Sequence, residues 1–158
     1  DYFAGMIKML YPEPQFSVRK RGGREEIFDA WRKAWVRLTP EEWVRQNILR
    51  WLTDVQAYPA GMVAVEKELV VGAMKKRYDI LIFDPGHRPW MLVECKAPEV
   101  ELSEKTLMQV LRYNMKVKAS YLVITNGHRC FAADIRAQPA IWISEMPPYP
   151  AGGPDQPR

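Results

Sequence analysis

The sequence predicts a single α/β domain in which helices flank a central mixed β-sheet, an α+β arrangement. Two stretches have apolar residues at helical spacing, and three apolar stretches typical of strands lie between them. Short turns join the three strands, which indicates an antiparallel meander, and the second helix then crosses over to a parallel strand. The chain has 158 residues, of which 47% are hydrophobic, so we expect one domain with a real core.

The first part of the chain is expected to be an extension of this domain. Pro12 and Pro14 break any helix near the start. The stretches QFSVRKR and EEIFD surround Gly22 and Gly23, which predicts a small hairpin, and residues 31–38 fit a helix or a strand. The sequence therefore divides into an extension over residues 1–37, a domain over residues 38–145, and a Pro- and Gly-rich tail over residues 146–158 that we expect to be disordered or extended.

The first helix has a clear start signal. Thr39 is a good N-cap, Pro40 suits the first helical position, and Glu42 completes a capping box. The stretch YPAG, residues 58–61, ends the helix. Helical spacing predicts a core-facing side formed by Val44, Ile48, Trp51 and Leu52, and an opposite side formed by Trp43, Gln46, Asn47, Leu49, Arg50 and Val55.

Strands and a second helix are expected in the rest of the domain. Three strands follow over residues 62–71, 77–84 and 90–96. Ser103 is the N-cap of the second helix, and the stretches SYLVITNG, HRCFAADI and AIWIS then predict short strands. One side of this helix carries Leu107, Val110, Leu111, Asn114 and Val117.

Charge and cysteine content limit the class of protein. The net charge of +4 and the pI of about 9.1 suit a polyanionic partner, although the basic clusters VRKRGGR and KKR are each also typical of a solvated surface. Cys95 and Cys130 lie in apolar stretches without metal-ligand spacing, so we expect buried reduced thiols in a cytoplasmic protein. No apolar run approaches the ~20 residues of a membrane span, so no membrane partner is expected.

Three charged residues interrupt the apolar strands. Glu94 and Lys96 share one face of their strand because side chains alternate, and the turn DPGHRP folds the preceding strand back so that Asp79 lies beside Glu94. Two neighbouring carboxylates repel each other, and a divalent cation such as Mg²⁺ or Mn²⁺ relieves that repulsion. A metal site for phosphodiester hydrolysis follows, although a surface ion-pair cluster explains the same three residues.

The stretch YDILIFD…MLVECKAP resembles the core of the PD-(D/E)XK nuclease superfamily, with Asp79 as the first acid and residues 94–96 as the E-x-K element. More closely, LTPEEWVRQNILRWL, VECKAP, QVLRYN and YLVITNG resemble, in family order, the N-terminal nuclease domain of type I restriction enzyme R subunits. The likeness covers roughly residues 38–134. It implies a restriction-endonuclease-like core and a Mg²⁺-dependent nuclease, with Mn²⁺ as a substitute, that hydrolyses DNA and has other restriction-system subunits as partners.

The resemblance implies roles for the matching residues in the strands. Asp79 and Glu94 would ligate the metal, and the backbone carbonyl of Cys95 would add a ligand. Lys96 would position the attacking water. Tyr78 stands where the superfamily pattern has proline, which many members tolerate.

Supporting roles fall on the helices and on basic residues. Glu42 matches an acidic position near the metal, but the capping box also explains it. Gln109 and Tyr113 match a Q-x-x-x-Y element that would hold the site or contact DNA, and a half-exposed helix face explains them equally. Glu66 and Glu68 are left outside the site. The expected DNA contacts are Lys75, Lys76, Arg77 and Arg45, the last of which also suits a structural role.

The chain lacks the length and the phosphate loop of the ATP-driven translocase in type I R subunits. It is therefore expected to be either a freestanding relative or a piece of a larger protein. Two other functions stay open. A catalytically inactive module for DNA binding or assembly would bind DNA without metal. An α/β domain that binds a small molecule or a protein would have no nucleic-acid role.

Overall fold

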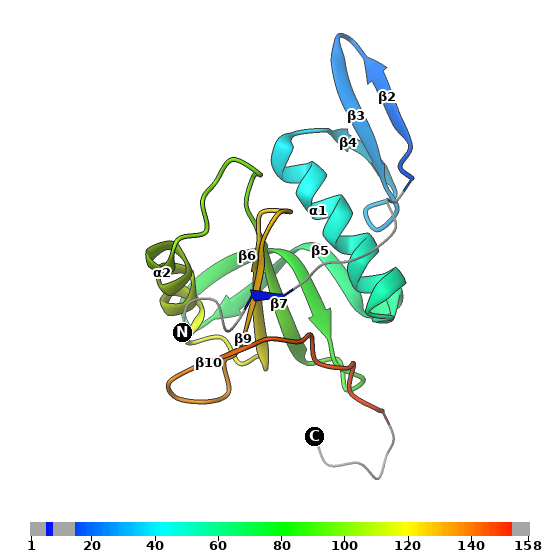
Figure 1. Cartoon of the computed structure of the whole chain (residues 1–158). Coiled ribbons are helices and arrows are strands. Elements are labelled where there is room, and N and C mark those ends of the chain that lie inside the picture. Colours follow the sequence, from blue (N-terminus) through cyan, green and yellow to red (C-terminus); the bar gives the residue numbers. More distant parts are fainter. Residues whose placement is uncertain (1–5, 8–14, 153–158) are drawn as a thin grey trace.

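The computed structural model describes residues 6–7 and 15–152, and within them it contains two β-sheets (Figure 1). The large sheet has the strand order β1-β9-β8-β7-β6-β5, and β10 also pairs with β9. Its strands are β1 (Met6–Ile7), β5 (Val63–Val71), β6 (Met74–Phe83), β7 (Pro89–Cys95), β8 (Tyr121–Thr125), β9 (Cys130–Asp134) and β10 (Ile141–Ile143). The small sheet has the order β2-β3-β4.

The centre of the large sheet confirms the predicted mixed α+β class. Strands β5, β6 and β7 form an antiparallel meander, whereas β7 and β8 are parallel. A parallel pair needs a crossover, and α2 (Glu104–Asn114) supplies it between β7 and β8. The register pairs Ile80 with Val93, which brings the segment that contains Asp79 next to the end of β7.

Helix α1 (Pro40–Arg50) covers one face of the large sheet. It continues into a π-helical turn (Trp51–Val55), and a 3₁₀ turn (Ala60–Met62) precedes β5. Thr39 caps the helix, as predicted, because its hydroxyl oxygen accepts a hydrogen bond from the Glu42 N–H at 3.0 Å. The four predicted core residues are buried, which confirms the helical spacing.

The prediction for the opposite side of α1 is wrong at Leu49 and Gln46, which are also buried. Leu49 belongs to the hydrophobic cluster between α1 and the large sheet, and the Gln46 amide donates to Glu42 at 3.1 Å. The small sheet also approaches this helix, through Arg32 and Phe16. The helix therefore buries a wider stripe than a surface helix does.

Helix α2 covers the opposite face of the large sheet and is capped by Ser103, as predicted. The sheet thus separates two hydrophobic clusters, one with α1 around Ile80 and Val93 and one with α2 around Leu81 and Leu92. The predicted inner side of this helix is buried at all five positions, Leu107, Val110, Leu111, Asn114 and Val117, although α2 ends at Asn114 and Val117 lies beyond it. Cys95 and Cys130 are buried free thiols, which confirms the prediction.

The small sheet consists of β2 (Val18–Arg21), β3 (Arg24–Asp29) and β4 (Ala34–Arg37) and lies on the α1 side of the molecule (Figure 1). The predicted hairpin is confirmed, with Gly22 and Gly23 at φ of 59° and 78° in its two-residue turn. Half of the ambiguous stretch 31–38, Ala34–Arg37, is strand β4, because its backbone pairs with β3.

The start of the predicted tail packs on the core without forming a helix or a strand. The Tyr58 hydroxyl donates to the Pro147 carbonyl at 2.6 Å, and the Tyr149 hydroxyl donates to the Phe83 carbonyl at 2.7 Å. Pro12, Pro14 and residues 153–158 lie outside the described residues. In the part of the chain that is described, no helix is both long and apolar enough to cross a membrane.

Candidate functional site

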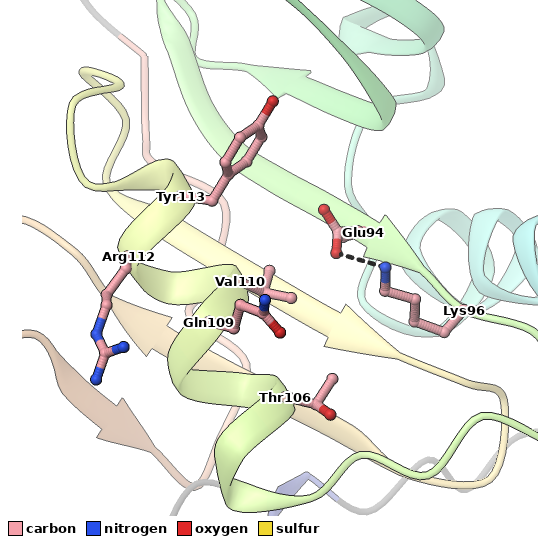
Figure 2. Close-up of a pocket in the computed structure, with 7 residues that line it drawn as sticks. All are labelled: Glu94, Lys96, Thr106, Gln109, Val110, Arg112 and Tyr113. Atoms are coloured by element: carbon pink, nitrogen blue, oxygen red, sulfur yellow. Dashed lines mark ion pairs between the residues drawn. The ribbon is translucent and has the colours of Figure 1, made fainter.

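A pocket of about 650 Å³ opens between the end of β7 and helix α2. Figure 2 shows Glu94 and Lys96 at the strand end, opposite the side of α2 that carries Gln109. The Lys96 ammonium lies 3.2 Å from the Glu94 carboxylate. Both side chains keep access to solvent, with 26% of Glu94 and 35% of Lys96 exposed, so both can meet a ligand. Tyr113 also lines the pocket, and its side chain is exposed.

The pocket therefore brings together four of the residues to which the sequence assigned a role. The i, i+4 spacing of Gln109 and Tyr113 sets them on one side of α2, as the Q-x-x-x-Y pattern requires. Thr106 and Arg112 line the same pocket and were not predicted. In Figure 2, Arg112 extends away from Glu94, whereas Thr106 lies on the side of Lys96.

Asp79 reaches the same strand end from β6. Its carboxylate accepts a hydrogen bond from the Cys95 N–H at 2.7 Å, so it is joined to the backbone between Glu94 and Lys96. Burial raises the pKa of Asp79 to about 6, against the hydrogen bond from Cys95 and the charge of Arg45, which lower it. The charges of Glu41 and Glu94 raise it further. Asp79 is therefore a desolvated acid that feels the charge of Glu94.

Arg45 is the cation that neutralises the acids on the α1 side of the site. Its guanidinium contacts Glu66, lies 3.4 Å from Glu42 and lies 3.9 Å from Asp79. Only 7% of its side chain is exposed. The prediction that Arg45 contacts DNA is therefore not supported, because three carboxylates enclose its guanidinium and keep it from the surface. Its position fits the structural role that the sequence also allowed.

Glu42 belongs to the same ion-pair network. Its carboxylate accepts a hydrogen bond from Arg32 at 2.7 Å and another from Gln46. The reciprocal half of the predicted capping box is therefore wrong, because this carboxylate is turned toward Arg32, and the Thr39 N–H instead donates to the Arg37 carbonyl.

The basic triplet before Asp79 is divided between the two faces of β6. Lys75 and Arg77 are exposed, whereas Lys76 is buried and donates to the Tyr113 carbonyl. The Lys76 ammonium lies 3.6 Å from the centre of the Tyr113 ring, and burial lowers its pKa. Arg77 pairs with Glu66 and Glu68. The triplet therefore does not form the single basic surface that the sequence suggested, because strand side chains alternate.

The donors at the strand end are of the kind that Mg²⁺ binds. Asp79 and Glu94 supply carboxylate oxygens, and the Cys95 thiol is buried in the core, so the backbone carbonyl is the atom of that residue with suitable chemistry. Among the described residues, no three His, Cys, Asp or Glu side chains gather into a complete ligand set. Mg²⁺ is commonly held by one or two carboxylates, with waters and substrate phosphates completing its shell, so the donor set fits this ion.

Sequence reasoning missed the link between the site and the small sheet. Arg32 pairs with Asp29, which is fully buried, and with Glu42 of α1. The sequence left Glu66 outside the site, yet its carboxylate accepts a hydrogen bond from Arg45. Burial raises the pKa of Glu66, but the hydrogen bond and charge of Arg45 outweigh burial and hold that pKa below its usual value. Neither residue has a motif or spacing that points to this network, since its members come from separate elements.

The comparisons with known proteins identify the family. The model of the type I restriction enzyme R protein N terminus matches residues 40–148. The chain belongs to this family. The resemblance seen in the sequence is thereby confirmed, and the matched residues include every residue of the candidate site at the end of β7 and on α2. A comparison with curated proteins finds no match.

One similar solved structure is that of a putative nuclease belonging to DUF820 from Anabaena variabilis. The two chains share 11% identity, and the likeness covers 72% of this chain and 68% of the other. The TM-score is 0.38, so nothing about the site is carried over from that structure.

Proposed function

We propose that this protein is a Mg²⁺-dependent nuclease that hydrolyses phosphodiester bonds of DNA. The observation that supports the proposal is the arrangement at the end of β7. There Lys96 lies 3.2 Å from Glu94, and Asp79 is hydrogen-bonded to the peptide between them. Family membership supports a restriction-type role, in which DNA is the substrate and other subunits of the restriction system are partners.

The proposal assigns each group a task. Asp79 and Glu94, with the Cys95 carbonyl, would hold Mg²⁺, which neutralises charge on a scissile phosphate and activates water when it is bound. Lys96 donates hydrogen bonds to the attacking water or to a phosphate oxygen, and its pairing with Glu94 keeps its ammonium at the strand end. Gln109 and Tyr113 line the pocket opposite and would contact the DNA backbone.

The test is cleavage of supercoiled plasmid in Mg²⁺, with chelator as the negative control. Lys96→Ala and Glu94→Gln should each lower the rate at least ~100-fold, which is the usual scale for a lost acid–base or charge-stabilising group. A matched pair of controls is Glu104→Gln and Lys105→Ala, since both residues are exposed at the start of α2 and do not line the pocket. Their rates should equal that of the wild type.

Two results would contradict the proposal in different ways. If both site variants keep metal-dependent cleavage, the site assignment is wrong. If the purified wild-type chain cuts neither supercoiled nor linear DNA with Mg²⁺ or Mn²⁺, the nuclease function itself is wrong for this chain.

A catalytically inactive DNA-binding or assembly module is the second candidate. It is favoured by the contact between Asp79 and Arg45, which gives this acid a cationic partner that needs no metal. This candidate predicts DNA binding that is unchanged by chelator and no cleavage under any condition. The same plasmid assay, run beside a binding assay with chelator, separates the two candidates.

A further inference from the structure

The excess of positively charged residues in this chain is located in the small sheet. Residues 18–37 contain seven of the 23 Lys and Arg residues and three of the 19 Asp and Glu residues. Their excess of four positive charges equals the formal net charge of +4, so the rest of the chain is balanced. A positive charge concentrated in one small element is the usual footprint of a polyanion-binding surface.

Alternation gathers most of these cations on one face of the small sheet. The register pairs Arg21 with Arg24, and it pairs Glu26 with both Arg19 and Arg37. Directly paired residues lie on the same face of a sheet. The arginine face, as we call it, therefore consists of Arg19, Arg21, Arg24, Glu26, Phe28, Trp35 and Arg37. Within strands β2 to β4, Glu26 is the one acid on this face.

The arginine face is open to solvent and partly preorganised. Arg21, Arg24 and Arg37 are exposed. The Arg19 guanidinium bonds Glu26 at 2.8 Å and lies 4.3 Å from the centre of the Trp35 ring. A guanidinium that is already fixed on a ring loses less freedom when it binds a ligand.

The opposite face anchors the sheet to the rest of the molecule. Ile27 and Asp29 point to that side and are fully buried. From Asp29, ion pairs run through Arg32 to Glu42 of α1 and from there to Arg45, whose guanidinium lies 3.9 Å from Asp79. The arginine face is thus held in a fixed relation to the candidate site.

We propose that the arginine face binds the phosphate backbone of DNA and positions the duplex for the candidate site. The choice of DNA rests on the proposed function. Four guanidinium groups against one carboxylate suit phosphates, which arginine binds through two parallel hydrogen bonds. A protein partner would need a dense cluster of carboxylates to match this charge, whereas every stretch of DNA backbone supplies closely spaced phosphates.

The test is the salt dependence of DNA binding, measured by fluorescence anisotropy with a labelled duplex of random sequence. Chelator is present throughout, so that cleavage plays no part. The test variant carries Arg21→Gln, Arg24→Gln and Arg37→Gln. Each lost phosphate contact lowers the slope of log K against log salt by about 0.9, so the slope should fall by about 2 to 3 and Kd at low salt should rise at least tenfold.

The matched control removes three cations at the other end of the large sheet, with Arg88→Gln, Lys118→Gln and Arg136→Gln. These residues lie beside the start of β7 and β8, opposite the strand end that bears Glu94. The control should bind as the wild type does. Thermal unfolding of both triple variants shows that they are folded, and Arg24→Gln alone, at the start of β3, should lower the slope by about 1.

Equal salt slopes for the two triple variants would overturn the proposal, as would a wild-type chain without DNA affinity at low salt. The latter result would point to a protein as the occupant of this face. Failure of the nuclease proposal is distinguishable from this outcome. In that case the wild-type chain would not cleave DNA in Mg²⁺, but the triple variants would still show the expected difference in salt slope.

Discussion

The raised pKa of Asp79 makes a quantitative prediction about stability. In an unfolded chain an aspartate ionises near its ordinary pKa of 3.8, whereas burial raises the pKa of Asp79 to about 6 in the folded protein. The folded state therefore binds a proton more tightly than the unfolded state does. Stability from this group is highest at low pH, falls as the pH rises from about 4 to about 6, and is constant above that.

Replacing Asp79 with Asn removes the loss of stability that accompanies ionisation of Asp79, because the amide stays neutral. The amide oxygen can still accept the hydrogen bond from the Cys95 N–H. At about 1.4 kcal/mol per pKa unit, Asp79→Asn should be more stable than the wild type by about 3 kcal/mol at pH 8. The difference should shrink to about 1 kcal/mol at pH 4.5. The attraction to Arg45 at 3.9 Å is already contained in the pKa of about 6, so its loss needs no separate correction.

The assay is urea denaturation between pH 4.5 and pH 8, followed by tryptophan fluorescence with chelator present. Asp134→Asn is the matched control, because hydrogen bonds from Arg136 hold the pKa of Asp134 below its usual value. That variant should be less stable than the wild type by a nearly constant amount across this pH range, because the pKa of Asp134 lies below 4.5 in both the folded and the unfolded state. An Asp79→Asn difference that stays flat across this pH range would refute the reasoning, since a desolvated acid must give a slope.

Three further predictions concern the same structural features. Arg45→Gln should lower the free energy of unfolding by about 1.5 to 3 kcal/mol, because it removes the buried cation and leaves Glu42 with Arg32 alone and Glu66 with Arg77 alone; a loss under 1 kcal/mol in urea denaturation would contradict this. Thr39→Ala should lower it by about 1 kcal/mol through the lost N-cap, and an unchanged denaturation midpoint would show that the cap contributes nothing. Burial raises the pKa of the Cys95 and Cys130 thiols, so a thiol reagent should label both in urea and neither in the native protein; rapid native labelling would show that they are accessible.

The fold was largely predictable because local signals and burial agree. Thr39 and Ser103 begin the two helices, as their capping chemistry requires, and the short turns fix the antiparallel meander. The errors arise where contacts from distant elements matter. Leu49 and Gln46 are buried because α1 has neighbours on two sides, which the periodicity of a single helix does not encode.

The candidate site was predictable in the same uneven way. Strand alternation correctly set Glu94 and Lys96 side by side, and the i, i+4 spacing correctly set Gln109 and Tyr113 on one side of α2. The surroundings of Arg45 were not predictable from sequence. Its partners come from α1, β5 and β6, and ion pairs between separate elements leave no spacing in the chain.

The sequence by itself determined that Glu94 and Lys96 share a face of β7 and that Gln109 and Tyr113 share a side of α2, because periodicities of 3.6 and 2 are local properties of the backbone. It also determined the family, through motifs that occur in order along the chain. Only the tertiary structure decided which charges meet. Arg45 is enclosed by carboxylates, Lys76 is buried under Tyr113, and the arginines of the small sheet face solvent. Burial and charge pairing are set by the distances between elements, and these exist only once the chain is folded.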